Sequence, residues 1–202
     1  MKLVIADRDG TINVEREGYI QTPDEWEPLP GALEAIVRLN QAGYQVVIAA
    51  NMPGLGRGLF DTAALNAIQA KMNRQLAEAG GRIEAMFYCP HAPDEDCACR
   101  KPLPGLFLQI GERFKVNLAQ VHAVGDSVRD AQAAAAAGCI PHLVLTGHSA
   151  PAPGAPLPPE FPAGTQVHAD LGAFATALLG EPPLADAPAD AASASARRPE
   201  AL

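Results

Sequence analysis

Short apolar runs alternate with segments of helical periodicity along most of this chain. The runs are bounded by turn residues, as buried strands are, and they cover residues 3–6, 44–50, 83–89, 121–124, 140–145 and 167–169. The helical candidates between them are residues 30–42, 61–79, 106–114, 131–137 and 171–179. This order predicts an α/β fold, a three-layer Rossmann-like parallel sheet with right-handed crossovers and helices on both faces.

The length of 202 residues suits one such domain, which we place at residues 1–180. No inserted segment is long enough for a large cap domain. Residues 149–165 are rich in Pro, Gly and Ala and are expected to form a loop. Residues 181–202 contain little besides Ala, Pro, Asp, Ser and Arg, so they cannot bury enough apolar area to offset their ordering entropy. We therefore expect an Ala/Pro-rich disordered tail.

The formal net charge of −8 argues against nucleic acid as a partner, because phosphate backbones require a basic face. A small anionic substrate is still compatible with this charge, since a few local cations can outweigh it. No segment approaches the roughly 20 apolar residues that span a bilayer, so no membrane contact is expected. The first strand follows Met1-Lys2 directly, without a secretory signal, and a cytoplasmic location is expected.

Two carboxylates, Asp7 and Asp9, follow the first apolar run, and Gly10 and Thr11 come next. Ligands in open α/β sheets bind just past the carboxyl ends of the strands, so both aspartates are placed at the edge of a site. They could share Mg²⁺, with one as nucleophile and the other carrying protons. Asp126 ends the fourth strand and is the natural further Mg²⁺ ligand, although it could instead cap the next helix. The bland alternative for the first pair is an acidic turn after a strand.

A second cluster combines Cys89, His91, Cys97 and Cys99. Three thiolates and one imidazole fit a closed tetrahedral Zn²⁺ site with a structural role, which would hold a loop over residues 89–101. Reactive or incidental thiols are the alternatives. Arg100 and Lys101 follow at once and suit a phosphate, although a solvated basic pair is the ordinary interpretation of two such residues.

Four short motifs resemble those of the haloacid dehalogenase-like phosphatases: Asp7-x-Asp9-Gly10-Thr11, Asn51, Lys101 and Gly125-Asp126. Within that family the chain is similar to the D-glycero-D-manno-heptose 1,7-bisphosphate 7-phosphatases over about residues 1–147. The features of this likeness are residues 7–13, Gly54-x-x-Arg57-Gly58, and the cysteine loop with residues 100–102. Histidinol-phosphate phosphatases share the metal loop, and Glu17-Gly18-Tyr19 with Arg57 favours the heptose enzymes.

The resemblance implies a Mg²⁺-dependent phosphatase that removes the 7-phosphate of the sugar through an aspartyl phosphate, in ADP-/GDP-heptose and lipopolysaccharide core biosynthesis. It makes Asp7 the nucleophile, Asp9 the general acid and base, and Lys101 the group that neutralises the phosphoryl oxygens. Asp7, Asp126 and the backbone carbonyl of Asp9 would hold Mg²⁺, and Arg100 would recognise the second phosphate. The expected substrate-binding residues are Glu17, Gly18, Tyr19, Asn51, Met52, Pro53, Arg57, Arg100, Lys101 and Ser127. The only expected partner is a small sugar phosphate, bound by a monomer.

The chain departs from the family pattern in its second motif, where Ala50 occupies the position of a Thr or Ser. Met52 and Pro53 likewise replace Gln and Ser, and Ser127 stands where the heptose enzymes carry Lys. One lost hydrogen bond to a charged oxygen costs roughly 1.5–3 kcal/mol. Two alternatives therefore stay open: a phosphatase for histidinol phosphate or another small ester, and a phosphate-ester binder with impaired catalysis.

Overall fold

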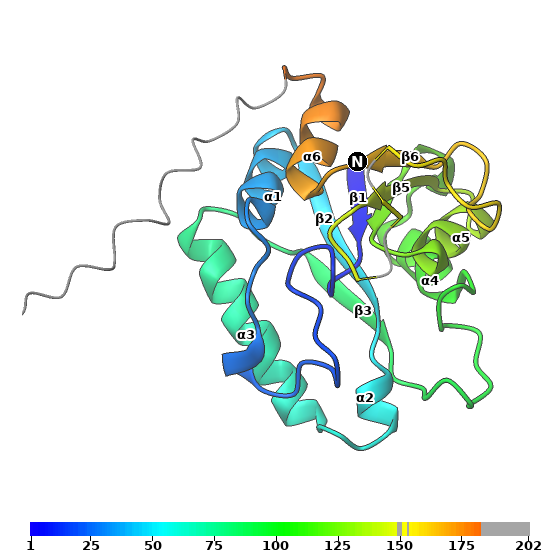
Figure 1. The fold of residues 1–202 in the computed structure, drawn as a ribbon. Helices are drawn as coiled ribbons and strands as arrows, with labels where there is room; N and C mark the ends of the chain where they lie inside the picture. The colour runs from blue at the N-terminus through cyan, green and yellow to red at the C-terminus, as the bar shows by residue number, and fades with distance from the viewer. Residues whose placement is uncertain (149–150, 153, 183–202) are drawn as a thin grey trace, which may run out of the picture.

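Six parallel strands form one sheet in the order β3-β2-β1-β4-β5-β6 in a computed structural model that describes residues 1–148, 151–152 and 154–182 (Figure 1). The strands are β1 (Lys2–Ala6), β2 (Tyr44–Asn51), β3 (Ala85–Cys89), β4 (His122–Gly125), β5 (Ile140–Val144) and β6 (Gln166–His168). The strand order reverses between β1 and β4, which pair with each other in register Val4↔His122. A crevice for a ligand is expected beyond the carboxyl ends of these two strands.

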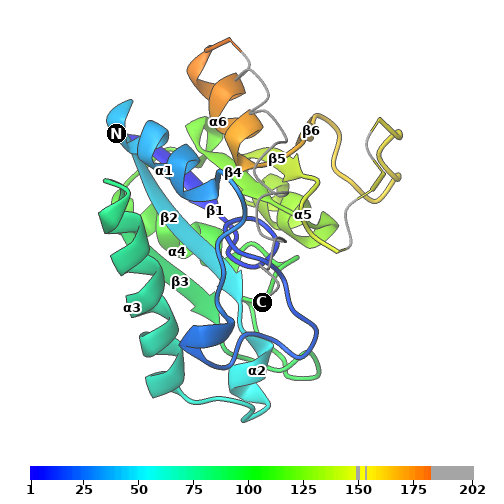
Figure 2. The ribbon, with the colours of Figure 1, turned by 60° about the vertical axis from the view of Figure 1, so that its left-hand side comes forward.

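Helices cover both faces of the sheet (Figures 1 and 2). One face carries α1 (Ala32–Gln41), α3 (Thr62–Glu78) and α6 (Leu171–Leu179), and the other carries α4 (Gly105–Phe114) and α5 (Val128–Ala136). Single short turns complete the elements: α2 (Pro53–Gly56), η1 (Pro23–Glu25) and η2 (Leu118–Gln120). The predicted three-layer α/β fold is confirmed.

The two cores follow from the alternation of side chains along each strand. In β1, Val4 and Ala6 belong to the core under α1, α3 and α6, whereas Leu3 and Ile5 belong to the core under α4 and α5. Strands buried on both faces are continuous apolar runs rather than alternating ones, which is why they were visible in the sequence.

Element boundaries differ from expectation where local capping decides them. The helix α5 begins at Val128 rather than at residue 131, because Ser127 and Asp130 form a capping box at its start. The Gly-rich loop after β2 starts with the helical turn α2, with Pro53 at its first position. Among the described residues the connections form no separate cap domain. Of the expected tail, residues 183–202 lie outside the described part.

None of the helices among the described residues combines the length and the apolar character needed to cross a bilayer.

Three histidines form a hydrogen-bonded row across neighbouring strands. Nδ1 of His122 on β4 lies 2.9 Å from Nε2 of His142 on β5, and Nδ1 of His142 lies 2.9 Å from Nε2 of His168 on β6. Phe174 of α6 packs edge-on against His142. Burial, followed by the neighbouring histidines, lowers the pKa of His142 to about 3, and burial also lowers the pKa of the other two. The row therefore holds neutral imidazoles, each hydrogen bond having one donor and one acceptor.

Replacement His142→Leu should reduce the loss of stability on acidification. The unfolded histidine binds a proton as the pH falls below about 6.5, whereas the folded one stays neutral to about pH 3. Its contribution is therefore complete above pH 6.5 and declines below it. Below pH 6 the free energy of unfolding should fall by ~1.4 kcal/mol per pH unit less steeply in the variant than in the wild type. Urea denaturation at pH 7, 6 and 5 measures both slopes.

Leu59 supplies the control, since it is 46% exposed and carries no titratable group. The variant Leu59→Ala should retain the wild-type slope. Equal slopes for the wild type and His142→Leu would contradict a neutral buried row.

Candidate active site

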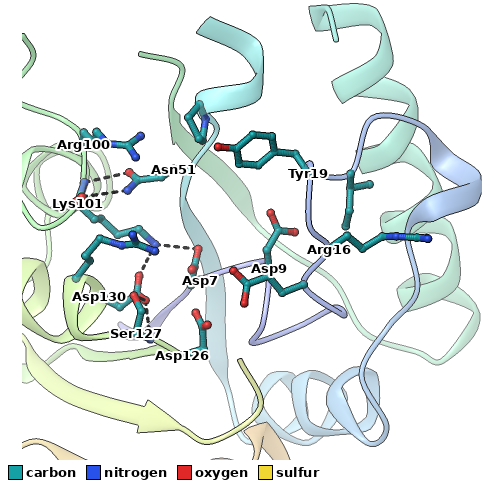
Figure 3. Close-up of a pocket in the computed structure, with 14 residues that line it drawn as sticks. Asp7, Asp9, Arg16, Tyr19, Asn51, Arg100, Lys101, Asp126, Ser127 and Asp130 are labelled. Atoms are coloured by element: carbon teal, nitrogen blue, oxygen red, sulfur yellow. Dashed lines mark hydrogen bonds and ion pairs between the residues drawn. The ribbon is translucent and has the colours of Figure 1, made fainter. Parts of the chain in front are cut away.

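The carboxyl ends of β1 and β4 bring two predicted site residues together. Asp7 directly follows β1, and Asp126 directly follows β4, while the Asp7 backbone N–H donates to the carbonyl of Val124 at 2.8 Å. Asp130 joins them from the first turn of α5, and one carboxylate oxygen from each of the three lies within 4.8 Å of the others (Figure 3). The expected convergence at the point of strand reversal is what the structure has.

A glycine gives Asp126 its space. Gly10 adopts φ 78°, and a Cβ atom built on it would lie 2.5 Å from Oδ2 of Asp126. Such a contact is too close for any side chain, and the positive φ favours glycine as well. Gly10, which directly follows Asp9, thus leaves room for the carboxylate of Asp126 at the end of β4.

Lys101 is the cation in the centre of this acidic group. Its Nζ lies 2.8 Å from Oδ1 of Asp7 and 2.5 Å from Oδ1 of Asp130, and it donates to the carbonyl of Ala49 at 2.8 Å. Burial lowers the pKa of Lys101, but the charges of Asp130 and Asp7 outweigh it and raise the pKa above its usual value. The ammonium group therefore stays charged beside Asp7, where it can neutralise an incoming phosphoryl group.

The combined negative charge of Asp7, Asp126 and Asp130 is more than one lysine can balance. Burial raises the pKa of Asp7 to about 7, and burial together with the charges of Asp7 and Asp130 raises the pKa of Asp126 to about 8. Asp130 is already engaged by Lys101 and by the hydroxyl of Ser127, 2.5 Å away. Asp7 and Asp126 are left as oxygen donors of the kind that Mg²⁺ takes, so the residues present fit that ion.

Asn51 borders the cavity but uses its amide on the backbone of Lys101. Its Nδ2 donates to the Lys101 carbonyl at 3.1 Å, and its Oδ1 accepts from the Lys101 N–H at 3.0 Å. This reciprocal pair joins the end of β2 to residue 101, and so fixes where the lysine side chain starts.

Asp9 faces the same cavity from the loop after β1. Its side chain is 26% exposed, and it forms a two-point ion pair with Arg8, Nε to Oδ1 and Nη2 to Oδ2, both at 2.9 Å. Asn13 donates to the same Oδ1 at 2.9 Å. A carboxylate held in this way can carry a proton while remaining in contact with the cavity.

The cavity has a volume of about 270 Å³. Nine of its lining residues were expected from the sequence: Asp7, Asp9, Tyr19, Asn51, Pro53, Arg100, Lys101, Asp126 and Ser127. Five others were not: Glu15, Arg16, Ile20, Arg129 and Asp130. Asp130 was not expected at the cavity wall, although the Ser127-x-x-Asp130 capping pattern in the sequence indicates how its side chain is oriented.

The structure does not bring Glu17, Gly18, Met52 or Arg57 to the cavity wall. The Met52 side chain is buried in the core with that of Ala50, since both lie on the same side of the chain. Arg57 donates to the hydroxyl of Tyr19 at 3.1 Å and so contacts a wall residue.

The four expected zinc ligands lie together beside the cavity. Their ligand atoms are all within 4.8 Å of one another, and the sulfur atoms of Cys89 and Cys97 are 3.8 Å apart. Two thiolates on one tetrahedral Zn²⁺ at about 2.3 Å would be separated by about 3.8 Å. Nδ1 of His91 lies 3.4 Å from Sγ of Cys89 and 3.3 Å from Sγ of Cys99, so the donor set fits a closed zinc site.

Comparison with known proteins shows which family the chain matches. A model of the haloacid dehalogenase-like hydrolases matches residues 2–138. The D-glycero-beta-D-manno-heptose-1,7-bisphosphate 7-phosphatase of Bordetella bronchiseptica is 55% identical over 183 residues, which are 90% of this chain and 99% of that protein. The Pseudomonas aeruginosa protein of the same name is 48% identical over 177 residues, 88% of this chain and 97% of that one.

A solved structure agrees with these relatives. The crystal structure of D,D-heptose 1,7-bisphosphate phosphatase from B. bronchiseptica, complexed with magnesium and phosphate, has a TM-score of 0.83 and 55% identity to this chain. The match covers 89% of this chain and 99% of that one. With the conserved fold, the family match over residues 2–138 and relatives this similar over nearly their whole length, the chain belongs to the haloacid dehalogenase-like hydrolases.

Proposed function

We propose that the protein removes the 7-phosphate of D-glycero-D-manno-heptose 1,7-bisphosphate, as the names of its relatives indicate for them. The observation that carries the proposal is the contact between Oδ1 of Asp7 and Nζ of Lys101, 2.8 Å apart, at the floor of a cavity that Asp9 also faces. One ester in this cavity would then be within reach of a nucleophile (Asp7), a cation that neutralises charge (Lys101) and a group that carries protons (Asp9). This activity serves the supply of activated heptose for lipopolysaccharide core.

The reaction proceeds in two steps on the residues of this chain. In the first, an oxygen of Asp7 forms a bond to phosphorus, the bond from phosphorus to the sugar oxygen breaks, and Asp9 gives that oxygen a proton. In the second, Asp9 takes a proton from water, whose oxygen bonds to phosphorus as the bond to Asp7 breaks. Lys101 stays beside the phosphoryl oxygens throughout.

Asp7, Asp126 and the backbone carbonyl of Asp9 would hold Mg²⁺. When bound, the ion supplies positive charge to the phosphoryl oxygens. The cysteine loop would hold Zn²⁺ in a structural role and so fix Arg100 and Lys101, which directly follow Cys99.

Arg100 is the residue we assign to the second phosphate. It lines the cavity, and within the described residues its side chain makes a single hydrogen bond, from Nη1 to the carbonyl of His91 at 3.4 Å, and no ion pair. A guanidinium group with free donors at a cavity wall binds phosphate oxygens as a fork.

Replacement Asp7→Asn should lower kcat/KM for heptose 1,7-bisphosphate by at least about a thousandfold, because the amide of Asn cannot attack phosphorus to form the aspartyl phosphate. Phosphate release with Mg²⁺, and with a chelator, measures the loss and the metal requirement. Asp61→Asn is the matched control, since Asn retains the helix-capping role that Asp61 has at α3. Substantial turnover by Asp7→Asn would overturn the mechanism.

Replacement Arg100→Met should distinguish recognition of the second phosphate of the substrate from turnover at the 7-phosphate. We expect kcat/KM for the 1,7-bisphosphate to fall by about 10- to 100-fold, the equivalent of one charged hydrogen-bond partner, with little change for heptose 7-phosphate. Arg74→Met, on the exposed face of α3, is the control. Histidinol phosphate belongs in the same assay, and preference for it over the bisphosphate would assign the substrate differently.

Replacement Cys97→Ala should weaken zinc binding by at least about a hundredfold and lower the thermal midpoint of unfolding. Cys139→Ala removes the fourth cysteine, which lies outside the cluster, and should retain one zinc per chain. The measurement is the zinc content per chain of the two purified variants. Equal zinc contents in the two variants would contradict the assigned ligands.

A further inference from the structure

Arg8 is a buried cation that the proposed reaction does not yet use. Its side chain is 2% exposed, and its Nη1 atom has no hydrogen-bond partner among the described residues. A buried guanidinium with one unpaired nitrogen is costly, and an apolar side chain of similar volume is often at least as stable. Stability alone therefore does not account for an arginine at this position.

All the hydrogen bonds that Arg8 makes through its side chain go to Asp9, within the described residues. The fork of Nε and Nη2 contacts both carboxylate oxygens at 2.9 Å. Two parallel bonds fix the plane of a carboxylate as well as its position, which a single ammonium group cannot do.

The two oxygens of Asp9 differ in their remaining capacity. Oδ1 accepts from Arg8 Nε and also from Asn13 Nδ2, so both of its lone pairs are used. Oδ2 accepts only from Arg8 Nη2 and keeps one lone pair on a side chain that lines the cavity. A protonated Oδ2 can therefore still accept from Arg8 while its O–H points elsewhere.

We infer that Arg8 is the positioning residue for proton transfer, and that Oδ2 of Asp9 is the atom that delivers the proton. In the first step the Oδ2–H bond breaks and an O–H bond forms on the departing sugar oxygen, as the bond from that oxygen to phosphorus breaks and the bond from Asp7 to phosphorus forms. Arg8 then neutralises the carboxylate that remains. The inference rests on the proposed phosphatase function and adds to it the group that aims its acid.

The test compares two leaving groups. The sugar alkoxide of heptose 1,7-bisphosphate needs a proton as it departs, whereas the p-nitrophenolate of p-nitrophenyl phosphate does not. The quantity to measure is kcat/KM for each, because it reports the steps up to phosphoryl transfer and omits the later attack of water. In Arg8→Met the ratio of sugar to aryl kcat/KM should fall by 10- to 100-fold. Arg8→Lys keeps the charge without the fork and should not restore the ratio.

Two further variants calibrate the ratio. Asp9→Asn should lower it at least as far as Arg8→Met does. Arg38→Met removes another arginine that pairs with a carboxylate, that of Glu181, on α1 and away from the cavity, and should keep the wild-type ratio. Fluorescence of the buried Trp26 shows whether each variant is folded.

An equal loss on both substrates would overturn the inference, because a general disturbance of the site affects every ester alike. An unchanged ratio in Arg8→Met would overturn it as well. If the wild type does not hydrolyse the heptose bisphosphate, the proposed substrate is wrong, and the ratio measured with histidinol phosphate, also an alkyl ester, tests Arg8 independently.

Discussion

Like charges held close together at the ends of β1 and β4 are the constraint around which the site is built. Asp7, Asp126 and Asp130 converge there, and burial raises the pKa of the first two. Lys101 compensates part of this charge from between Asp7 and Asp130. The remaining excess favours a divalent cation, and a phosphate ester brings further negative charge that the same cations must hold. The arrangement is thus unfavourable in isolation and favourable with metal and substrate, as a preorganised site requires.

The supports of the site come from segments far apart in the sequence. Asn51 at the end of β2 holds the backbone of Lys101, and the four Cys and His side chains of the cysteine loop lie together just before it in the chain. Arg8 and Asn13 hold Asp9 from the buried side. Lys101 and Asp9, two residues that line the cavity, are therefore each held in place by other residues. Precise positioning of this kind is where most of the rate enhancement in phosphoryl transfer originates.

Sequence patterns predicted the parallel α/β sheet, the proximity of Cys89, His91, Cys97 and Cys99, and the convergence of Asp7 with Asp126, because buried strands and strand-end carboxylates follow simple rules. They did not place Arg16 or Arg129 at the cavity. Arg16 lies in the irregular segment after β1, whose path local patterns do not determine, and Arg129 lies in the first turn of α5, a helix whose start was expected only at residue 131. Met52 was expected at the substrate, whereas the structure buries it in the core. The alternation of side chains along β2 explains this burial, since Ile48 and Ala50 face the same core as Met52.

The contact between α1 and α6 has a consequence for how the molecule is made. Arg38 on α1 donates to Thr176, 138 residues later in the chain, and Phe174 is buried in the same core as Ile36. While the ribosome is still producing the middle of the protein, this side of α1 has nothing to pack against. This part of the core can therefore form only late in synthesis and through contacts between distant segments, which are slow to form. The nascent chain accordingly exposes apolar surface for longer than a helical bundle of this size would.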